Sequence, residues 1–203
     1  MISHRFFHVI FFVFLFLVIP GSPVFSDLTQ KSKGVLSVYG EIPKFELTDQ
    51  FGKPFSSDQL KGKIWISDFI FTRCQGQCPL MSGKMAVLQK QLRDSNVQLV
   101  SFSVDPDYDS PQILSEYAER FHANKSWVFL TGEKSKIWEL ASGGFMLGVQ
   151  AANPEDLAQG AEPVMHSSRF VLVDQQGKIR GFFDSSDSDK MNELVKSVQT
   201  LTN

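Results

Sequence analysis

The sequence predicts an α/β domain in which a central mixed sheet is flanked by helices. Residues 64–71 and 97–104 are nearly continuous apolar runs rich in β-formers, which is typical of strands that are covered on both faces. A helical pattern follows each run, and residues 170–183 read as an antiparallel hairpin before a last helix over 188–201. Strands that alternate with helices favour a sheet with parallel neighbours at its centre.

Composition limits the class of function. The chain has 203 residues, of which 42% are hydrophobic and 21% are charged, and its formal net charge is −2. Such a chain can bury the core of one globular domain. Because nucleic-acid binding calls for a concentrated basic surface, we do not expect nucleic acid as a partner.

The first 26 residues predict an export segment. An apolar run spans Val9–Ile19, and Val24 and Ser26 fit the small-residue rule for signal-peptide cleavage. This run is shorter than the ~20 apolar residues that a spanning helix needs. Counted back to Phe6 the run is longer, so an uncleaved membrane anchor remains the alternative. Either way, we expect the rest of the chain outside the cytoplasm, in the periplasm or on the outer face of the inner membrane.

A linker and an N-terminal β-hairpin extension are expected next. Residues 27–40 are small and polar and read as a linker, so the domain is expected to span residues 41–203. Residues 45–48 alternate apolar and polar like a strand, and a turn at 49–53 leads to a short second strand. Residues 64–71 then form the central strand.

The two cysteines lie between this central strand and a helix. Pro79 follows Cys78, and proline is favoured at the first position of a helix, so we expect the helix to begin at Pro79 with Cys78 as its cap. Four apolar residues at helical spacing form the expected buried face: Met81, Met85, Leu88 and Leu92.

The second half continues the alternation. The expected elements are a helix from Pro111 to about His122, capped by Ser110, a strand at 126–130, a helix at 133–142 and the closing hairpin and helix. Residues 143–165 show little periodicity, and a loop of that length in a compact domain is usually functional or mobile. This order of elements is that of a thioredoxin-like fold.

The spacing of Cys74 and Cys78 predicts metal or redox chemistry. Amide groups and the helix dipole favour thiolates at a helix N-terminus, and Arg73 adds positive charge. Two cysteines cannot build a four-thiolate zinc site, but they can close one disulfide or supply two ligands to a mixed site. Three intervening residues can point both sulfurs at one ion and still permit a disulfide. A disulfide that is only structural is the further alternative.

Three motifs resemble those of the Sco/SenC family. They are Thr72-Arg73-Cys74-x-x-x-Cys78-Pro79, then Ser103-Val104-Asp105-Pro106 followed by Asp109-Ser110-Pro111, and then His166-Ser167-Ser168 leading into Leu172-Val173-Asp174. The resemblance covers roughly residues 41–200. It implies a copper-binding metallochaperone that assists assembly of the copper centre of cytochrome c oxidase. It also implies Cys74, Cys78 and His166 as the metal ligands.

The implied ligands agree with copper chemistry. Two thiolates and one imidazole suit soft Cu(I), and Cu(II) can be accepted with a fourth ligand. Ligand type alone leaves zinc open, and the resemblance favours copper. The implied partner is the copper-bearing subunit of cytochrome c oxidase or another copper carrier, and the membrane is contacted only through a possible N-terminal anchor.

A thiol–disulfide reductase and a redox sensor are the rival functions. Asp68 lies six residues before Cys74 and resembles the buried acid of thioredoxins, which assists proton transfer to the second cysteine. Against a general reductase, no proline lies between Pro163 and the strand at 170–174, where thioredoxin-like reductases carry one.

Asp105 is expected near the site, where it orients the cysteine loop or pairs with a partner's surface. The alternative for Asp105 is a turn-forming role before Pro106.

Overall fold

The structure is a computed structural model that describes residues 36–202. The predicted export segment and residues 27–35 of the predicted linker lie outside the described residues. Within residues 36–202, no helix has both the length and the apolarity that crossing a membrane requires. Residues 36–40, assigned above to the linker, lie along the sheet, where the Tyr39 amide donates to the Ile179 carbonyl over 3.0 Å.

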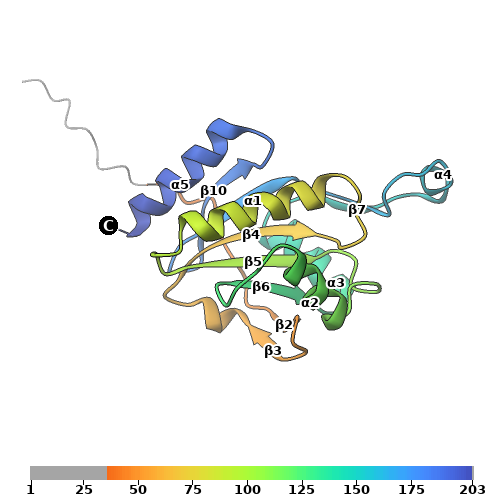
Figure 1. Cartoon of the computed structure of the whole chain (residues 1–203), viewed down its shortest axis with the longest axis horizontal. Helices are drawn as coiled ribbons and strands as arrows, with labels where there is room; N and C mark the ends of the chain where they lie inside the picture. The colour runs from red at the N-terminus through yellow and green to blue at the C-terminus, as the bar shows by residue number, and fades with distance from the viewer. Residues whose placement is uncertain (1–35, 203) are drawn as a thin grey trace, which may run out of the picture. The chain divides into compact units, whose positions relative to one another are not determined.

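One mixed sheet carries the fold (Figure 1). Its strands, in spatial order, are β1 (Gly40–Glu41), β10 (Lys178–Asp184), β9 (Arg169–Val173), β4 (Ile64–Ile70), β5 (Val97–Ser103), β6 (Trp127–Thr131), β2 (Glu46–Asp49) and β3 (Pro54–Ser56). The β4, β5 and β6 strands are parallel, and the other neighbours pair antiparallel. The predicted α/β class and the N-terminal hairpin, now β2 and β3, are confirmed.

Five α-helices and two short turns of other helix types complete residues 36–202. The helices are α1 (Gln77–Gln91), α2 (Pro111–Arg120), α3 (Lys134–Glu139), α4 (Pro154–Ala158) and α5 (Ser188–Thr202), with a 3-10 turn η1 (Ser57–Leu60) and a π-helical turn η2 (Leu140–Gly144). The crossovers from β4 to β5 and from β5 to β6 carry α1 and α2 on the same face of the sheet, where the hydroxyl groups of Ser82 in α1 and Tyr117 in α2 lie 2.9 Å apart.

The side chains of β4 separate the two faces of the sheet. All seven residues of β4 are buried, as the apolar run predicts. Trp65 and Phe69 face η2, because their rings lie 5.8 and 5.1 Å from the ring of Phe145 in edge contacts. Side chains alternate along a strand, so Asp68 faces the opposite layer, where α1 lies.

Helix α1 begins earlier than the sequence predicts. It starts at Gln77 with Gly76 as its cap residue, so Cys78 lies within the first turn and is not the cap. Pro79 is tolerated there because the first four amide groups of a helix have no carbonyl partner within the helix, so its missing N–H costs nothing. The bias of a residue before proline against helical geometry is outweighed at Cys78.

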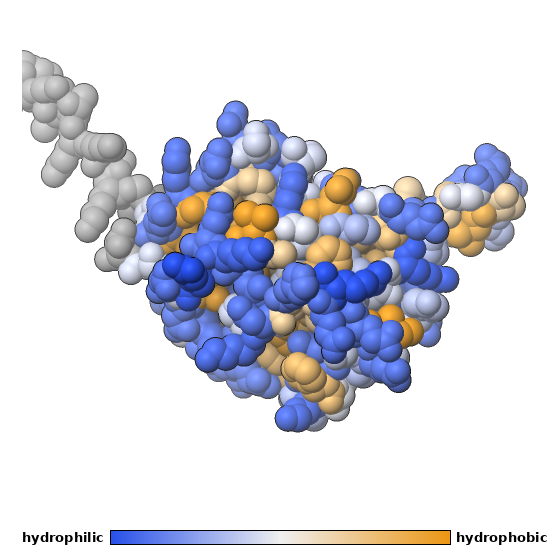
Figure 2. All heavy atoms as spheres, in the orientation of Figure 1, coloured by the Kyte–Doolittle hydropathy of each residue, from blue (hydrophilic) through white to orange (hydrophobic). Residues whose placement is uncertain are grey.

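The segment predicted as a long loop contains regular structure. After η2 it forms β7 (Val149–Ala151), α4 and β8 (Val164–His166), and β7 pairs with β8 in a sheet of two strands. We call residues 149–166 the arm. It projects from the body in Figure 1, and its visible face in Figure 2 is mostly hydrophilic with a small hydrophobic patch. Elements of three to five residues are too short to produce a periodic sequence pattern.

Candidate metal centre

Cys78 and His166 meet at the carboxyl end of β4. Cys78 is held in the first turn of α1, and His166 is the last residue of β8. The Cys78 Sγ lies 3.1 Å from the His166 Nε2, although the two residues are 88 positions apart in the chain. Two of the three ligands implied by the resemblance are therefore already in contact.

The imidazole of His166 is oriented from two sides. Its Nδ1 lies 3.1 Å from the carbonyl oxygen of Ser167, an arrangement in which Nδ1–H donates and Nε2 carries the lone pair that faces Cys78. The ring of Phe71 meets the imidazole edge-on, with centroids 5.7 Å apart. Burial lowers the pKa of His166, which favours the neutral imidazole.

Cys78 is a buried thiol. Its side chain has no exposed surface, and its Sγ accepts a hydrogen bond from the Phe71 amide over 3.5 Å. Burial is the main reason why the pKa of Cys78 is raised, and the charges of Cys74 and Asp68 add to the effect. The sulfur therefore keeps its proton at neutral pH until a cation replaces it.

Cys74 lies beside this pair and forms no disulfide with Cys78. It is 7% exposed, and its Sγ accepts a hydrogen bond from the Cys78 amide over 3.4 Å. Across residues 36–202, no three His, Cys, Asp or Glu side chains are gathered closely enough to hold a metal ion as they stand. Holding an ion with all three predicted ligands therefore requires Cys74 to turn toward the Cys78–His166 pair.

The donor atoms of this pair fit a soft metal ion. The Cys78 sulfur faces the imidazole nitrogen of His166, and the Cys74 sulfur lies against the backbone amide of Cys78. Two sulfur donors and one nitrogen donor suit Cu(I). His166 also lines a shallow surface depression with Met165, Gly148 and Val149. His166 can therefore be approached from solvent on the side of the arm, whereas Cys78 is fully buried behind it.

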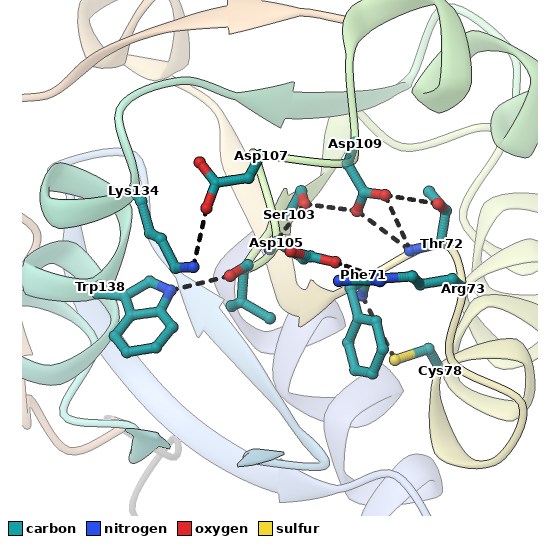
Figure 3. Close-up of polar contacts among 11 residues, drawn as sticks. Phe71, Thr72, Arg73, Cys78, Ser103, Asp105, Asp107, Asp109, Lys134 and Trp138 are labelled. Carbon is teal, nitrogen blue, oxygen red and sulfur yellow. Dashed lines mark hydrogen bonds and ion pairs between the residues drawn. The ribbon is translucent and has the colours of Figure 1, made fainter. Parts of the chain in front are cut away.

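A buried carboxylate, Asp109, holds the start of the cysteine loop (Figure 3). It accepts hydrogen bonds from the amide and the hydroxyl of Thr72, at 3.1 and 2.5 Å, and from the hydroxyl of Ser103, at 2.6 Å. Burial raises the pKa of Asp109, while these donors oppose the rise. The carboxylate thus joins the start of the cysteine loop to the end of β5.

Asp105 contacts the cysteine loop through Arg73 and not through either cysteine. The Arg73 Nε donates to the Asp105 carboxylate over 2.7 Å, and the guanidinium lies 4.9 Å from the ring centre of Tyr108. The side chain of Asp105 is only 4% exposed, which fits the expectation of loop orientation better than that of a partner contact.

Asp68 lies beneath the site and is fully buried. Its Oδ1 accepts from the Ser101 hydroxyl over 2.6 Å, and the Trp127 indole donates to that same hydroxyl over 2.9 Å. In residues 36–202 its Oδ2 has no hydrogen-bond partner. Burial raises the pKa of Asp68 to about 7, so the carboxyl can exchange a proton near neutral pH.

Helix α3 braces the loop that carries Asp105 and Asp109. The Trp138 indole donates to the Val104 carbonyl over 2.9 Å, and Lys134 pairs with Asp107 over 2.9 Å (Figure 3). The end of β5 is therefore held from the side opposite to the cysteine loop.

Three contributors to the site were not identified from the sequence. Asp109 stands in a motif quoted above, but its contact with Thr72 spans 37 positions. Phe71 reads as a strand residue, yet it contacts both Cys78 and His166. Glu162 lies in a segment without periodicity, and its carboxylate accepts from the Gln75 amide over 3.1 Å. Only Asp109 left a local sequence signal, the Asp-Ser-Pro helix start.

Comparison with known proteins places these features in context. A family model described as SCO1/SenC matches residues 38–203. The chain is 35% identical over 194 residues to the SCO1 protein homolog of Bacillus subtilis, covering 94% of this chain and 93% of that one. It is 35% identical over 143 residues to a Stutzerimonas stutzeri protein named for copper binding, covering 69% of this chain and 67% of that protein.

A solved structure confirms the predicted thioredoxin-like fold. The structure of BsSco matches with a TM-score of 0.70 and 33% identity, covering 84% of this chain and 97% of that one. That protein is described with a disulfide switch and as a member of the Sco family of cytochrome c oxidase assembly proteins.

Proposed function

This chain belongs to the SCO1/SenC family, and we propose on that basis that it carries copper for the assembly of the copper centre of cytochrome c oxidase. Copper is its cargo, and Cys74, Cys78 and His166 are the proposed ligands. The observation that carries the proposal is the 3.1 Å contact between the Cys78 sulfur and the free nitrogen of His166. The relative named for copper binding and the oxidase-assembly description of BsSco support it.

Loading exchanges the thiol protons for a metal ion. The Cys78 proton lies between sulfur and nitrogen in the metal-free site, and Nε2 of a neutral His166 offers its lone pair toward the same point. Copper binding releases the protons of both thiols to solvent, because the thiolate and not the thiol is the metal ligand. Phe71 and Ser167 hold the imidazole, so little rotamer freedom is lost when copper binds.

The proposed place of action is outside the cytoplasm. Residues 1–26 carry the apolar run and the small-residue site described above, which supports export to the periplasm or to the outer face of the inner membrane. The proposed partner is the copper-bearing subunit of the oxidase or another copper carrier.

A histidine substitution tests the proposal. Replacing His166 with Ala removes one ligand, and we expect the Cu(I) affinity to fall at least tenfold, which corresponds to about 1.4 kcal/mol or more. The measurement is a competition titration of the reduced protein against a Cu(I) chelator. His122 is the matched control, because it is the other histidine in residues 36–202 and is exposed. Its φ is +54°, so His122→Asn suits its backbone, and this variant should bind like the wild type.

Thiol–disulfide exchange is the second candidate function. The buried Asp68, with a pKa near 7 and a charge that acts on Cys78, favours it, as does the disulfide switch described for BsSco. In that reaction Cys74 and Cys78 give two electrons and two protons to a substrate disulfide and become a disulfide themselves. A reductase assay on the same preparations separates the functions. Unchanged copper affinity in His166→Ala, with wild-type reductase activity, would reject the copper proposal in favour of exchange.

A further inference from the structure

The arm is attached to the body of the protein by very few polar contacts. Within the described chain, one hydrogen bond joins residues 149–165 to anything outside the arm, and it is the bond from the Gln75 amide to the Glu162 carboxylate, 3.1 Å long. The helix of the arm, α4, has no buried residue, and β7 and β8 pair only with each other. The position of the arm therefore depends on a few contacts near its attachment to the body: this hydrogen bond, the burial of Val164 and the contacts of His166.

The two ends of that hydrogen bond lie next to the proposed ligands. Gln75 directly follows Cys74, and Glu162 stands four residues before His166. Glu162 is half-buried, although the rest of the outer arm, residues 153–161, is exposed. Its negative charge also lies close enough to His166 to raise the pKa of the imidazole against the effect of burial.

We propose that Glu162 is a positioning residue that ties the arm to the cysteine loop and so holds His166 against Cys78. The proposal deepens the copper-carrying function proposed above and rests on it for its metal readout. Gln75 is exposed, and Glu162 is the acceptor of its amide. Without this acceptor the described part of the arm keeps no hydrogen bond to the cysteine loop beyond the contact between Cys78 and His166, which is the contact that copper must enter. The edge-on packing of Phe71 on His166 and the burial of Val164 remain, but they are apolar contacts.

The charged side chains of the arm are acidic. Residues 149–166 contain three acids, Glu155, Asp156 and Glu162, and no Lys or Arg. Since Glu155 and Asp156 are exposed and form no ion pair within residues 36–202, Glu162 is the acid of the arm that is built into the site.

Three variants separate the hydrogen bond from the charge. Glu162→Ala removes both, whereas Glu162→Gln keeps a carbonyl acceptor for the Gln75 amide. Glu155→Ala is the matched control, because it removes the same charge from the same arm without touching the cysteine loop. The first readout is the hydrogen-exchange rate of the Gln75 amide, measured by NMR on the full chain in its reduced, metal-free form. The second is Cu(I) affinity by chelator competition.

In Glu162→Ala we expect the amide hydrogen of Gln75 to exchange at least threefold faster than in the wild type. We expect the same variant to bind Cu(I) three- to tenfold more weakly. Glu162→Gln and Glu155→Ala should stay close to the wild type in both measurements. The inference is overturned if Glu162→Ala matches Glu155→Ala, or if Glu162→Gln behaves like Glu162→Ala. Amide exchange needs no metal, so it tests the hydrogen bond between Gln75 and Glu162 even if the chain proves not to bind copper. If Glu162→Ala changes neither amide exchange nor Cu(I) affinity while His166→Ala weakens Cu(I) binding, the positioning role of Glu162 is rejected and the copper function stands.

Discussion

Ionisation of Asp68 should make the stability of this protein depend on pH in a direction unusual for a carboxyl group. Burial raises its pKa from 3.8 to about 7, so the folded state holds this proton more tightly than the unfolded state does. The group costs no stability below pH 3.8. The cost grows as the pH rises and levels off once the folded carboxyl ionises, above about pH 7.

The magnitude follows from the gap between the two pKa values. That gap is about three pH units, and each is worth about 1.4 kcal/mol, so the full loss of unfolding free energy is about 4 kcal/mol. Between pH 5 and pH 8 the expected share is roughly 2–3 kcal/mol. Asp68→Asn cannot ionise. Its amide nitrogen would take the place of the unpartnered Oδ2, which costs about 1–3 kcal/mol at every pH.

The quantity to measure is therefore the difference in unfolding free energy between Asp68→Asn and the wild type at several pH values. Urea titrations of the reduced, metal-free proteins supply it, with tryptophan fluorescence as the probe. The difference should shift by roughly 2–3 kcal/mol in favour of Asn between pH 5 and pH 8. Asp94→Asn, at an exposed carboxylate, should show no such shift. A flat difference for Asp68→Asn would mean that the carboxyl is hydrated and titrates near its ordinary value, which would refute the reasoning.

Two further predictions concern the loop and the thiol. Asp109→Asn should lower the unfolding free energy by about 2 kcal/mol, because a buried acceptor of three hydrogen bonds loses one oxygen. In the same urea titration the control Asp107→Asn, which breaks an exposed ion pair, should lower the unfolding free energy by at most about 0.5 kcal/mol. The Cu(I) affinity should rise at least tenfold per pH unit between pH 6 and pH 8, because binding must release the proton of the buried Cys78. The measurement is chelator competition at several pH values, and an affinity that does not change with pH would show that Cys78 is not a ligand.

The order of strands and helices was readable from the sequence because it depends on local patterns. The apolar runs of β4 and β5 and the Ser110-Pro111 helix start each lie within one short window, and the structure reproduces them. The sequence pattern predicts a start of α1 at Pro79, two residues later than the start at Gln77 in the structure, since a proline restricts its predecessor only weakly in the first turn of a helix. The pairing of β7 with β8 was missed because strands of three residues carry no period.

The sequence by itself determined which chemistry is available, namely two thiols at a helix N-terminus and one histidine before a strand. Only the tertiary structure decided how those groups meet. The Cys78–His166 contact spans 88 positions and the Gln75–Glu162 contact 87, and no local rule predicts either. Burial, which raises the pKa values of Cys78 and Asp68, is likewise a property of the packed core, because it depends on neighbours brought together from the whole chain.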